Sequence, residues 1–295
     1  QMKKMKLIYN PIAGDGTFKL YFDQLFRILQ EHDIVVEPFR TFNKGDAEQA
    51  VEEIDESYDG VIAVGGDGTV SEAACGLLKS KMDIPLGIIP WGTINDLAHF
   101  LNIPKDLSEC CQIIINNKRK PVDMGVVNGH FYFINVVSAG FLTDVAYKTR
   151  PDFKNIFGRF AYYVKGLEGL PNLKPIKLKV LSEGRSVFEG ESYLIVVLNS
   201  SSAGGFYRLA PRAVLDDGKL DVIILKACPT PELISTSIKV LKGEHLKDRN
   251  IVYFQTHDLK ILGNYELPSD VDGEMGPFLP LEIGVKPRAL KIFVP

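Results

Sequence analysis

Cysteine is scarce in this chain of 295 residues, which has only four. They show neither Cys-x-x-Cys spacing nor a disulfide framework, so we expect them to be reduced. No apolar run is long enough to span a bilayer, and the first residues lead into a predicted strand rather than a signal-peptide core. The formal net charge of −3 lacks the basic excess of nucleic-acid binders. These absences predict a cytoplasmic protein, at most peripheral to a membrane, with no nucleic-acid partner.

Several catalytic motifs are missing as well. The chain contains neither a Walker A sequence nor the Gly-x-Ser-x-Gly elbow of serine hydrolases. Its five histidines never stand four residues apart around an acid, so a zinc site has little support. The segment 66–71 also lacks the third glycine of a dinucleotide-binding fingerprint.

A glycine turn after residues 61–64 is the most informative feature that is present. The apolar run 61–64 predicts a buried parallel strand, and the glycines that follow permit positive φ and close approach of the backbone. These glycines are Gly65, Gly66 and Gly68. Thr69 and Glu72 have the spacing of a capping box, which predicts a helix whose free N–H groups could bind phosphate. The alternative is an ordinary turn from a strand to a helix.

A second copy of this pattern argues against that alternative. Residues 84–90 predict another short strand, and Gly92 with the segment 93–96 repeats the Thr-x-x-acid spacing. If the two strands are parallel neighbours, both turns lie at the carboxyl edge of the sheet, where α/β proteins bind ligands. Asp67 and Asp96 would repel a phosphate there unless a cation lies between them. We therefore predict a nucleotide together with Mg²⁺.

The segments 65–69 and 87–98 resemble the nucleotide-binding motifs of the diacylglycerol kinase and sphingosine kinase catalytic-domain superfamily. The first motif is shared with NAD kinases, and the second is more specific. The resemblance covers nearly the whole chain. It implies an ATP-dependent lipid kinase of lipid metabolism that phosphorylates a lipid hydroxyl at a membrane surface, with diacylglycerol giving phosphatidic acid as the expected reaction.

The resemblance also implies a set of nucleotide-binding residues. They are Asn10, Thr41, Gly65, Gly66, Asp67, Gly68, Thr69, Glu72, Gly92, Thr93, Asn95 and Asp96. This chain departs from the family in its first loop, where Ile12 and Asp15 replace the usual basic residues and Lys19 is the nearest cation. That departure leaves a phosphate role for the loop and a plain turn as equal alternatives.

Two magnesium sites follow from the same resemblance. Asp67, Asp96 and Asp123 would hold the active-site ion through water molecules, although Asp123 could also be a turn aspartate before Gly125. A structural ion would be held by Asp217 and by the backbone carbonyls of two neighbours. These neighbours are Val214 and Lys219. The Asp-Asp-Gly sequence there also suits a hairpin turn.

The catalytic base is expected in the segment 269–274, which resembles the Asp-Gly-Glu motif of the family. In that family the aspartate is proposed to take the proton from the acceptor hydroxyl. Apart from this proton transfer, phosphoryl transfer requires mainly positioning of the reactants and neutralisation of charge. We therefore assign Asp272 as the base and Glu274 as a supporting acid. The alternative is a common hairpin turn.

The fold prediction is an α/β domain followed by a β domain. Alternating strands and helices up to residue 125 predict a doubly wound parallel sheet, and the short strands after it predict an antiparallel β-sandwich. We expect domains at 1–125 and 126–295, with the active site in the cleft between them. The predicted helices cover residues 17–32, 46–57, 106–115, 143–147, 157–170 and 232–241.

Other predictions concern partners. The segment 147–165 interleaves cations with aromatic residues, which suits a membrane surface. The alternative is that its aromatics form the core face of an amphipathic helix with the cations on its wet side, and both can hold in part. A homodimer is possible. Trp91, the only tryptophan, is expected beside the nucleotide or in the core. The competing functions are an NAD kinase and a nucleotide-binding regulatory protein that has lost catalysis.

Overall fold

The computed structural model describes residues 2–140 and 174–295. Two compact units divide the chain: Gln1–Val122 with Arg288–Pro295, and Asp123–Pro287. Both boundaries fall inside strands, β5 and β15. The last eight residues, which the sequence analysis placed in the second domain, therefore group with the first, because the end of β15 pairs with β4.

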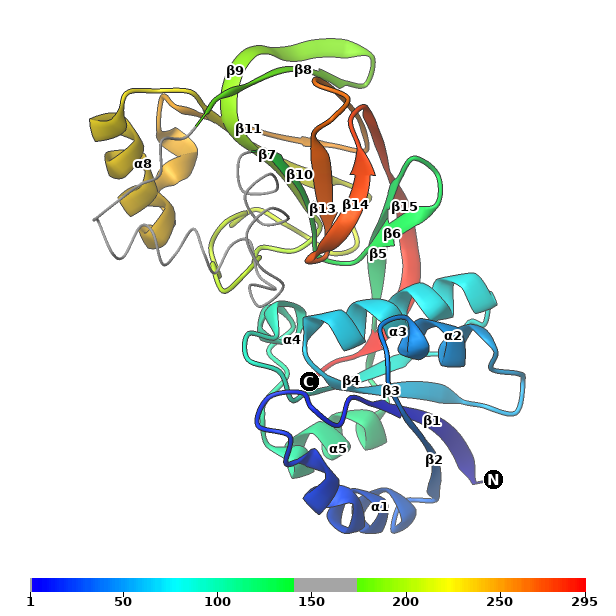
Figure 1. Cartoon of the computed structure of the whole chain (residues 1–295). Helices are drawn as coiled ribbons and strands as arrows, with labels where there is room; N and C mark the ends of the chain where they lie inside the picture. The colour runs from blue at the N-terminus through cyan, green and yellow to red at the C-terminus, as the bar shows by residue number, and fades with distance from the viewer. Residues whose placement is uncertain (1, 141–173) are drawn as a thin grey trace. The chain divides into compact units, whose positions relative to one another are not determined.

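The first unit is a parallel α/β domain, as predicted. Its strands are β1 (Lys3–Tyr9), β2 (Ile34–Arg40), β3 (Gly60–Gly65) and β4 (Leu86–Pro90). Its helices are η1 (Phe18–Tyr21, 3₁₀), α1 (Phe22–Gln30), α2 (Asp46–Glu52), α3 (Asp67–Ser80), α4 (Asp96–Phe100) and α5 (Leu107–Asn116). The strand order is β2-β1-β3-β4, and all of these pairs are parallel. Helices α2 and α3 cover one face of the sheet, and α1 and α5 cover the other (Figure 1).

Burial explains why these strands form. Every residue of β3 and β4 is buried, as expected for interior parallel strands with helices on both faces. The edge strand β2 is mostly half-exposed. The predicted helix 17–32 is divided into η1 and α1, and the helix predicted over 46–57 ends at Glu52.

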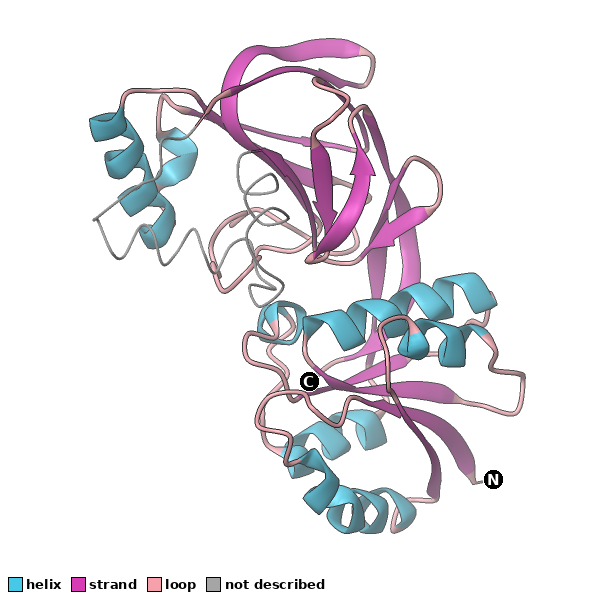
Figure 2. Ribbon diagram, viewed as in Figure 1, coloured by secondary structure: helices cyan, strands magenta, loops and turns pink. Residues whose placement is uncertain are grey.

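The second unit is built from antiparallel strands. They are β6 (Phe131–Phe133), β7 (Val136–Gly140), β8 (Ile176–Ser182), β9 (Arg185–Leu198), β10 (Leu220–Lys226), β11 (Ile251–Thr256), β12 (Asp258–Leu262), β13 (Pro268–Val271) and β14 (Glu274–Phe278), with most of β5 (Arg119–Val127) and of β15 (Leu281–Phe293). The first half of β9 pairs with β8 and its second half pairs with β7, so this long strand lies between them in one continuous sheet. Strands dominate this unit (Figure 2). Helix α8 (Thr230–Lys242) and the short η2 (His245–Lys247) complete the described elements.

Two apolar clusters fill this unit. One gathers Val137, Ile195 and Leu259 with other side chains from the inner faces of the strands. The other lies between the opposite faces of β9 and β10 and helix α8, and includes Val196, Ile223 and Leu233. Strands β5, β13 and β14 were not predicted from the sequence. The helices predicted at 143–147 and 157–170, and the membrane segment predicted at 147–165, lie outside the described residues.

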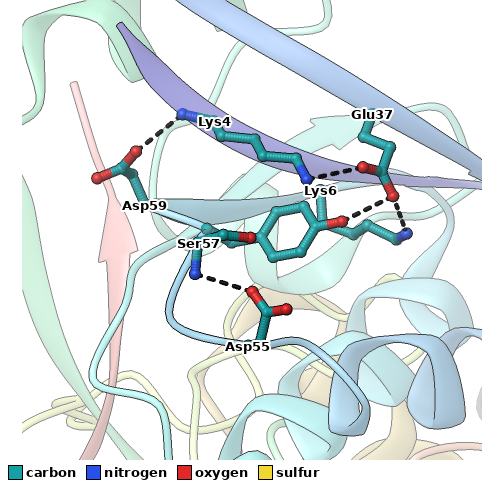
Figure 3. A network of polar contacts seen from close by, with 7 residues as sticks. Lys4, Lys6, Glu37, Asp55, Ser57 and Asp59 are labelled. Carbon is teal, nitrogen blue, oxygen red and sulfur yellow. Dashed lines mark hydrogen bonds and ion pairs between the residues drawn. The ribbon is translucent and has the colours of Figure 1, made fainter. Parts of the chain in front are cut away.

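A polar network stabilises the first unit far from the carboxyl ends of its strands (Figure 3). Lys6 and Tyr58 both donate to one oxygen of Glu37 at 2.7 Å, and Lys4 lies 2.9 Å from the other. These contacts, with Lys6 the strongest, lower the pKa of Glu37 to about 2. The network is partly exposed, so we expect a modest contribution to stability.

Candidate active site

The two glycine turns touch each other at the carboxyl edge of the first sheet. Strands β3 and β4 are parallel neighbours, with Gly65 opposite Pro90. A Cβ atom added at Gly92 would lie 2.3 Å from the Cα of Gly66, a distance that no real side chain tolerates. The contact between the turns therefore requires glycine. Both turns lie at one edge of the sheet, as predicted from their sequences.

The reason for the glycines differs from the prediction in one respect. None of Gly65, Gly66 and Gly68 has a positive φ. At Gly65 the requirement is instead close approach, because an added Cβ would lie 2.5 Å from the hydroxyl oxygen of Thr69. Thr69 is buried, so its side chain packs back onto the turn rather than toward solvent.

The predicted capping box is wrong. Helix α3 begins at Asp67, two residues before Thr69, and its N-cap residue Gly66 makes no side-chain cap. The carboxylate of Glu72 instead accepts the backbone N–H groups of Gly45 and Ala47 at 3.0 and 3.2 Å. It thereby holds the start of α2 against α3. The first N–H groups of α3 remain at the glycine turn, where the helix dipole favours an anion.

Asp67 ties the second turn to the first. Its two carboxylate oxygens accept the backbone N–H groups of Asn95 at 2.9 Å and Asp96 at 2.7 Å. The predicted Thr-x-x-acid cap at Thr93 is also wrong, because α4 begins at Asp96 and its N-cap is Asn95, with a φ of 59°. The Asn95 amide closes the turn by accepting from the N–H of Gly92 at 3.0 Å and donating to its carbonyl at 2.7 Å.

The remaining predicted nucleotide contacts also lie at this edge. The backbone N–H of Asn10 donates to the carbonyl of Val64, and its side-chain oxygen accepts the N–H of Ile12 at 3.1 Å. Thr41 is buried, and both its N–H and its hydroxyl donate to the carbonyl of Tyr9. Each of the strands β1, β2, β3 and β4 is thus followed, at its carboxyl end, by residues that were predicted to contact the nucleotide.

Trp91 packs against the first loop. Its ring centroid lies 5.2 Å from that of Phe18 and 5.1 Å from that of Tyr21, and its Nε1 donates to Asp15 at 3.3 Å. Hydrogen bonds from the hydroxyl and N–H of Thr17 lower the pKa of Asp15. The tryptophan is half-buried. Trp91 belongs to the second glycine turn, so its contacts join that turn to the first loop. This is the loop in which Asp15 replaces an expected basic residue.

Asp272 occupies a tight turn in the second unit. It follows β13 and precedes Gly273 and β14, and both turn residues have positive φ, 50° and 88°. Its carboxylate accepts three backbone N–H groups at 2.8 to 2.9 Å. They belong to Ile134, Asn135 and Val136. Hydrogen bonds to the charged form favour an ionised carboxylate and fix its orientation. Glu274 is exposed on the strand that follows.

Asp123 is fully buried within β5, not in a turn. Its carboxylate accepts the N–H of Gly218 at 2.7 Å, and its own N–H donates to the carbonyl of Leu215. Asn199 links this aspartate to the Asp272 region, since its amide donates to the carbonyls of Asp123 and Ile134 at 2.8 and 2.9 Å.

The predicted magnesium residues offer oxygen ligands, which suit this ion. In the described part of the chain, no three or more His, Cys, Asp or Glu side chains are grouped closely enough to hold a metal ion by themselves. A magnesium ion that keeps its waters needs only one or two carboxylates, and Asp67 and Asp96 are joined through one hydrogen bond. Asp217 accepts the N–H of Lys219 at 3.0 Å, as in an Asx turn.

Asp270 is a site residue that the sequence analysis missed. It lies two residues before Asp272 on β13, is 2% exposed, and accepts the N–H of Gly273 at 3.0 Å. Burial raises its pKa to about 7, and the charges of Asp272 and Glu274 act in the same direction. The only signal for Asp270 in the sequence is its position as an acidic residue two places before the Asp-Gly-Glu motif at 272–274.

Two family models match the chain. The diacylglycerol kinase catalytic domain matches residues 4–127, and the YegS C-terminal NAD kinase beta sandwich-like domain matches residues 135–294. A diacylglycerol kinase of Bacillus subtilis (strain 168) is 36% identical over 296 residues, which cover 100% of this chain and 97% of that protein. This chain belongs to the diacylglycerol kinase family. It is therefore a phosphotransferase of a lipid kinase family, which implies the use of ATP.

Other diacylglycerol kinases are also similar to this chain over nearly its whole length. The diacylglycerol kinase of Staphylococcus aureus (strain Newman) is 36% identical over 99% of this chain and 93% of that protein. A solved diacylglycerol kinase from Bacillus anthracis has a TM-score of 0.79 at 25% identity, covering 100% of this chain and 98% of that one. An NAD kinase from Archaeoglobus fulgidus, solved with ATP, shares the fold at a TM-score of 0.57 and 13% identity, over 98% of this chain and 93% of that one.

No helix within the described ranges is long and apolar enough to cross a membrane.

Proposed function

We propose that this protein transfers the γ-phosphate of ATP to the hydroxyl of diacylglycerol, giving phosphatidic acid. The observation that carries the proposal is the environment of Asp272. Its carboxylate is held by three backbone N–H groups on a turn whose sequence resembles the Asp-Gly-Glu motif. Relatives along the whole chain that bear the name diacylglycerol kinase support this lipid as the acceptor.

The nucleotide phosphates would bind at the glycine turn before α3. The N-terminal N–H groups of this helix of 14 residues and its dipole favour an anion. The close contact between Gly66 and Gly92 leaves no room for a side chain at position 92, so the two turns meet through their backbones. The proposed nucleotide contacts remain those named from the sequence, with Asn10 and Thr41 at the ends of the neighbouring strands.

Magnesium would be held through waters by Asp67, Asp96 and Asp123, and it would neutralise charge on the phosphates. The hydrogen bonds of Asp67 to the second turn keep its carboxylate in one place whether or not an ion is bound. Asp217 and the carbonyls of Val214 and Lys219 would hold the structural ion. The hydrogen bond between Asp123 and Gly218 would keep that loop in place.

Asp272 would accept the proton of the acceptor hydroxyl as the phosphoryl group is transferred, with Glu274 as a supporting acid. A base must be ionised before it can accept a proton, and the three backbone donors favour that form. The step needs little further covalent chemistry from the protein, because phosphoryl transfer depends mainly on positioning and charge neutralisation. The lipid acceptor implies a peripheral contact with the membrane.

The test is incubation of the purified protein with γ-labelled ATP, Mg²⁺ and a panel of acceptors. The panel contains diacylglycerol in vesicles, other lipid alcohols, NAD and a control without acceptor. Label in phosphatidic acid is the expected result. Label only in NADP would replace the proposal with an NAD kinase, and label in no acceptor, despite binding of ATP, would favour a regulatory protein.

A further inference from the structure

Phe42 is an exposed aromatic residue two positions after the end of β2. Its side chain is 75% exposed, although the guanidinium group of Arg40 lies over the ring at 4.4 Å from the centroid. Single exposed apolar side chains are common on proteins and need no special explanation. Two further observations distinguish this one, namely the way its backbone is held and its distance from the glycine turn.

The backbone of Phe42 is fixed by a carboxylate. The N–H groups of Phe42 and Asn43 both donate to one oxygen of Asp46 at 2.7 Å. These two hydrogen bonds, the one from Asn43 being the stronger, lower the pKa of Asp46, so the contact is with a charged acceptor. The exposed ring therefore stands on a rigid base, which reduces the entropy lost when a ligand packs on it.

The same loop is tied to the phosphate turn. Glu72, in the second turn of α3, accepts the N–H groups of Gly45 and Ala47 on either side of Asp46. Phe42 is thus connected to the helix whose first residues form the proposed phosphate site through two carboxylates, Asp46 and Glu72. This arrangement ties the backbone of the loop after β2 to helix α3 within the first unit.

The separation suits a nucleotide. In the strand order β2-β1-β3, the end of β2 is two strands from the end of β3. Adjacent strands lie about 4.8 Å apart, so the end of β2, which Phe42 follows by two residues, lies on the order of 10 Å from the end of β3. The hydrogen bonds from Thr41 to Tyr9 and from Asn10 to Val64 keep these strand ends level. A base is separated from the outer phosphates of its nucleotide by a span of this size.

We propose that the ring of Phe42 is a stacking platform for the base of the bound nucleotide and favours purines over pyrimidines. This inference rests on the proposed function, which supplies the nucleotide. Every base has a flat π-face that stacks on an aromatic ring, and the larger purine covers more of it. Arg40, already stacked on the ring, adds a positive charge beside the base, where cations and aromatic faces attract one another.

The experiment measures binding to the full-length protein by isothermal titration calorimetry in the presence of Mg²⁺. The titrants are ATP, CTP and inorganic tripolyphosphate, which has the phosphates without a base. The variants are Phe42→Ala and the conservative Phe42→Trp. The control is Tyr265→Ala, which removes an aromatic ring of equal exposure, 75%, from the second unit. Thermal unfolding checks that each exposed-site variant is folded.

We expect Phe42→Ala to weaken ATP binding about tenfold, to weaken CTP binding less and to leave tripolyphosphate binding unchanged. The KM for ATP should rise in parallel while kcat stays constant, and Phe42→Trp should bind ATP as tightly as the wild type. Unchanged ATP binding by Phe42→Ala, or an equal loss for tripolyphosphate, would overturn the platform while leaving the nucleotide site in place. If the wild type binds none of the three titrants, the proposed function itself is wrong.

Discussion

The carboxylate of Asp67 accepts a hydrogen bond of 2.7 Å from the backbone N–H of Asp96, and this contact joins the starts of the helices that follow two neighbouring strands. Asparagine at this position would keep the shape of the side chain but lose the charge and one acceptor. We predict that Asp67→Asn destabilises the protein by about 1–3 kcal/mol, because a partly buried N–H loses its acceptor. It should also lower kinase activity, partly restored by raised Mg²⁺.

Thermal unfolding and a Mg²⁺ titration of kcat/KM separate these two effects. Glu31→Gln is the matched control, since it removes an exposed carboxylate in the same unit. An activity loss in Asp67→Asn that no concentration of Mg²⁺ relieves would mean that Asp67 acts only through its hydrogen bonds to the second turn.

Asp270 predicts a pH dependence of stability. Burial raises its folded-state pKa from 3.8 to about 7, so the folded protein binds a proton that the unfolded chain releases between these values. The resulting stability is complete below pH 3.8 and is lost as the pH rises through 7, with a slope of at most about 1.4 kcal/mol per pH unit. Asp270→Asn keeps an acceptor for Gly273 and cannot ionise, so it should raise the melting temperature at pH 8.

The measurement is the melting temperature of both proteins from pH 4 to pH 8. Asp258→Asn is the control, because this aspartate is exposed in the same unit. A difference between wild type and Asp270→Asn that stays constant with pH would show that the carboxyl of Asp270 does not titrate in this range.

Trp91 should report nucleotide binding. The ring is half-buried between Phe18 and Tyr21, and the backbone N–H of Trp91 donates to the carbonyl of Gly65 in the first glycine turn. We expect its fluorescence to shift when ATP and Mg²⁺ are added, and no other tryptophan contributes to the signal. A spectrum that does not change at saturating ATP would assign the ring to packing of the first loop alone.

The two glycine turns of the first unit could be predicted because their signals are local. Buried apolar strands followed by glycine turns identified β3 and β4, and their parallel pairing followed from the alternation of strands and helices. The partners of the side chains could not be predicted in this way. Glu72 has the spacing of a helix cap, but its carboxylate bonds to residues more than 20 positions earlier, because α2 packs against α3.

The strands β13 and β14 were missed for a related reason. Ser269 and Asp270 are polar yet fully buried in the middle of the sheet, so their sequence looks like a loop. Their burial depends on pairing with β7, which lies about 130 residues earlier in the chain. The sequence motif still located Asp272 itself, while its three backbone donors on residues 134–136 are visible only in the folded chain.

Asp272 is the residue on which the proposed reaction depends most. Asparagine there would keep two of the three hydrogen bonds to the backbone but could not accept a proton. We predict that Asp272→Asn lowers kcat for transfer of γ-labelled phosphate to diacylglycerol by at least about 100-fold, while calorimetry shows ATP binding within twofold of the wild type. Turnover near that of the wild type, with ATP still bound, would contradict the assignment of Asp272 as the catalytic base.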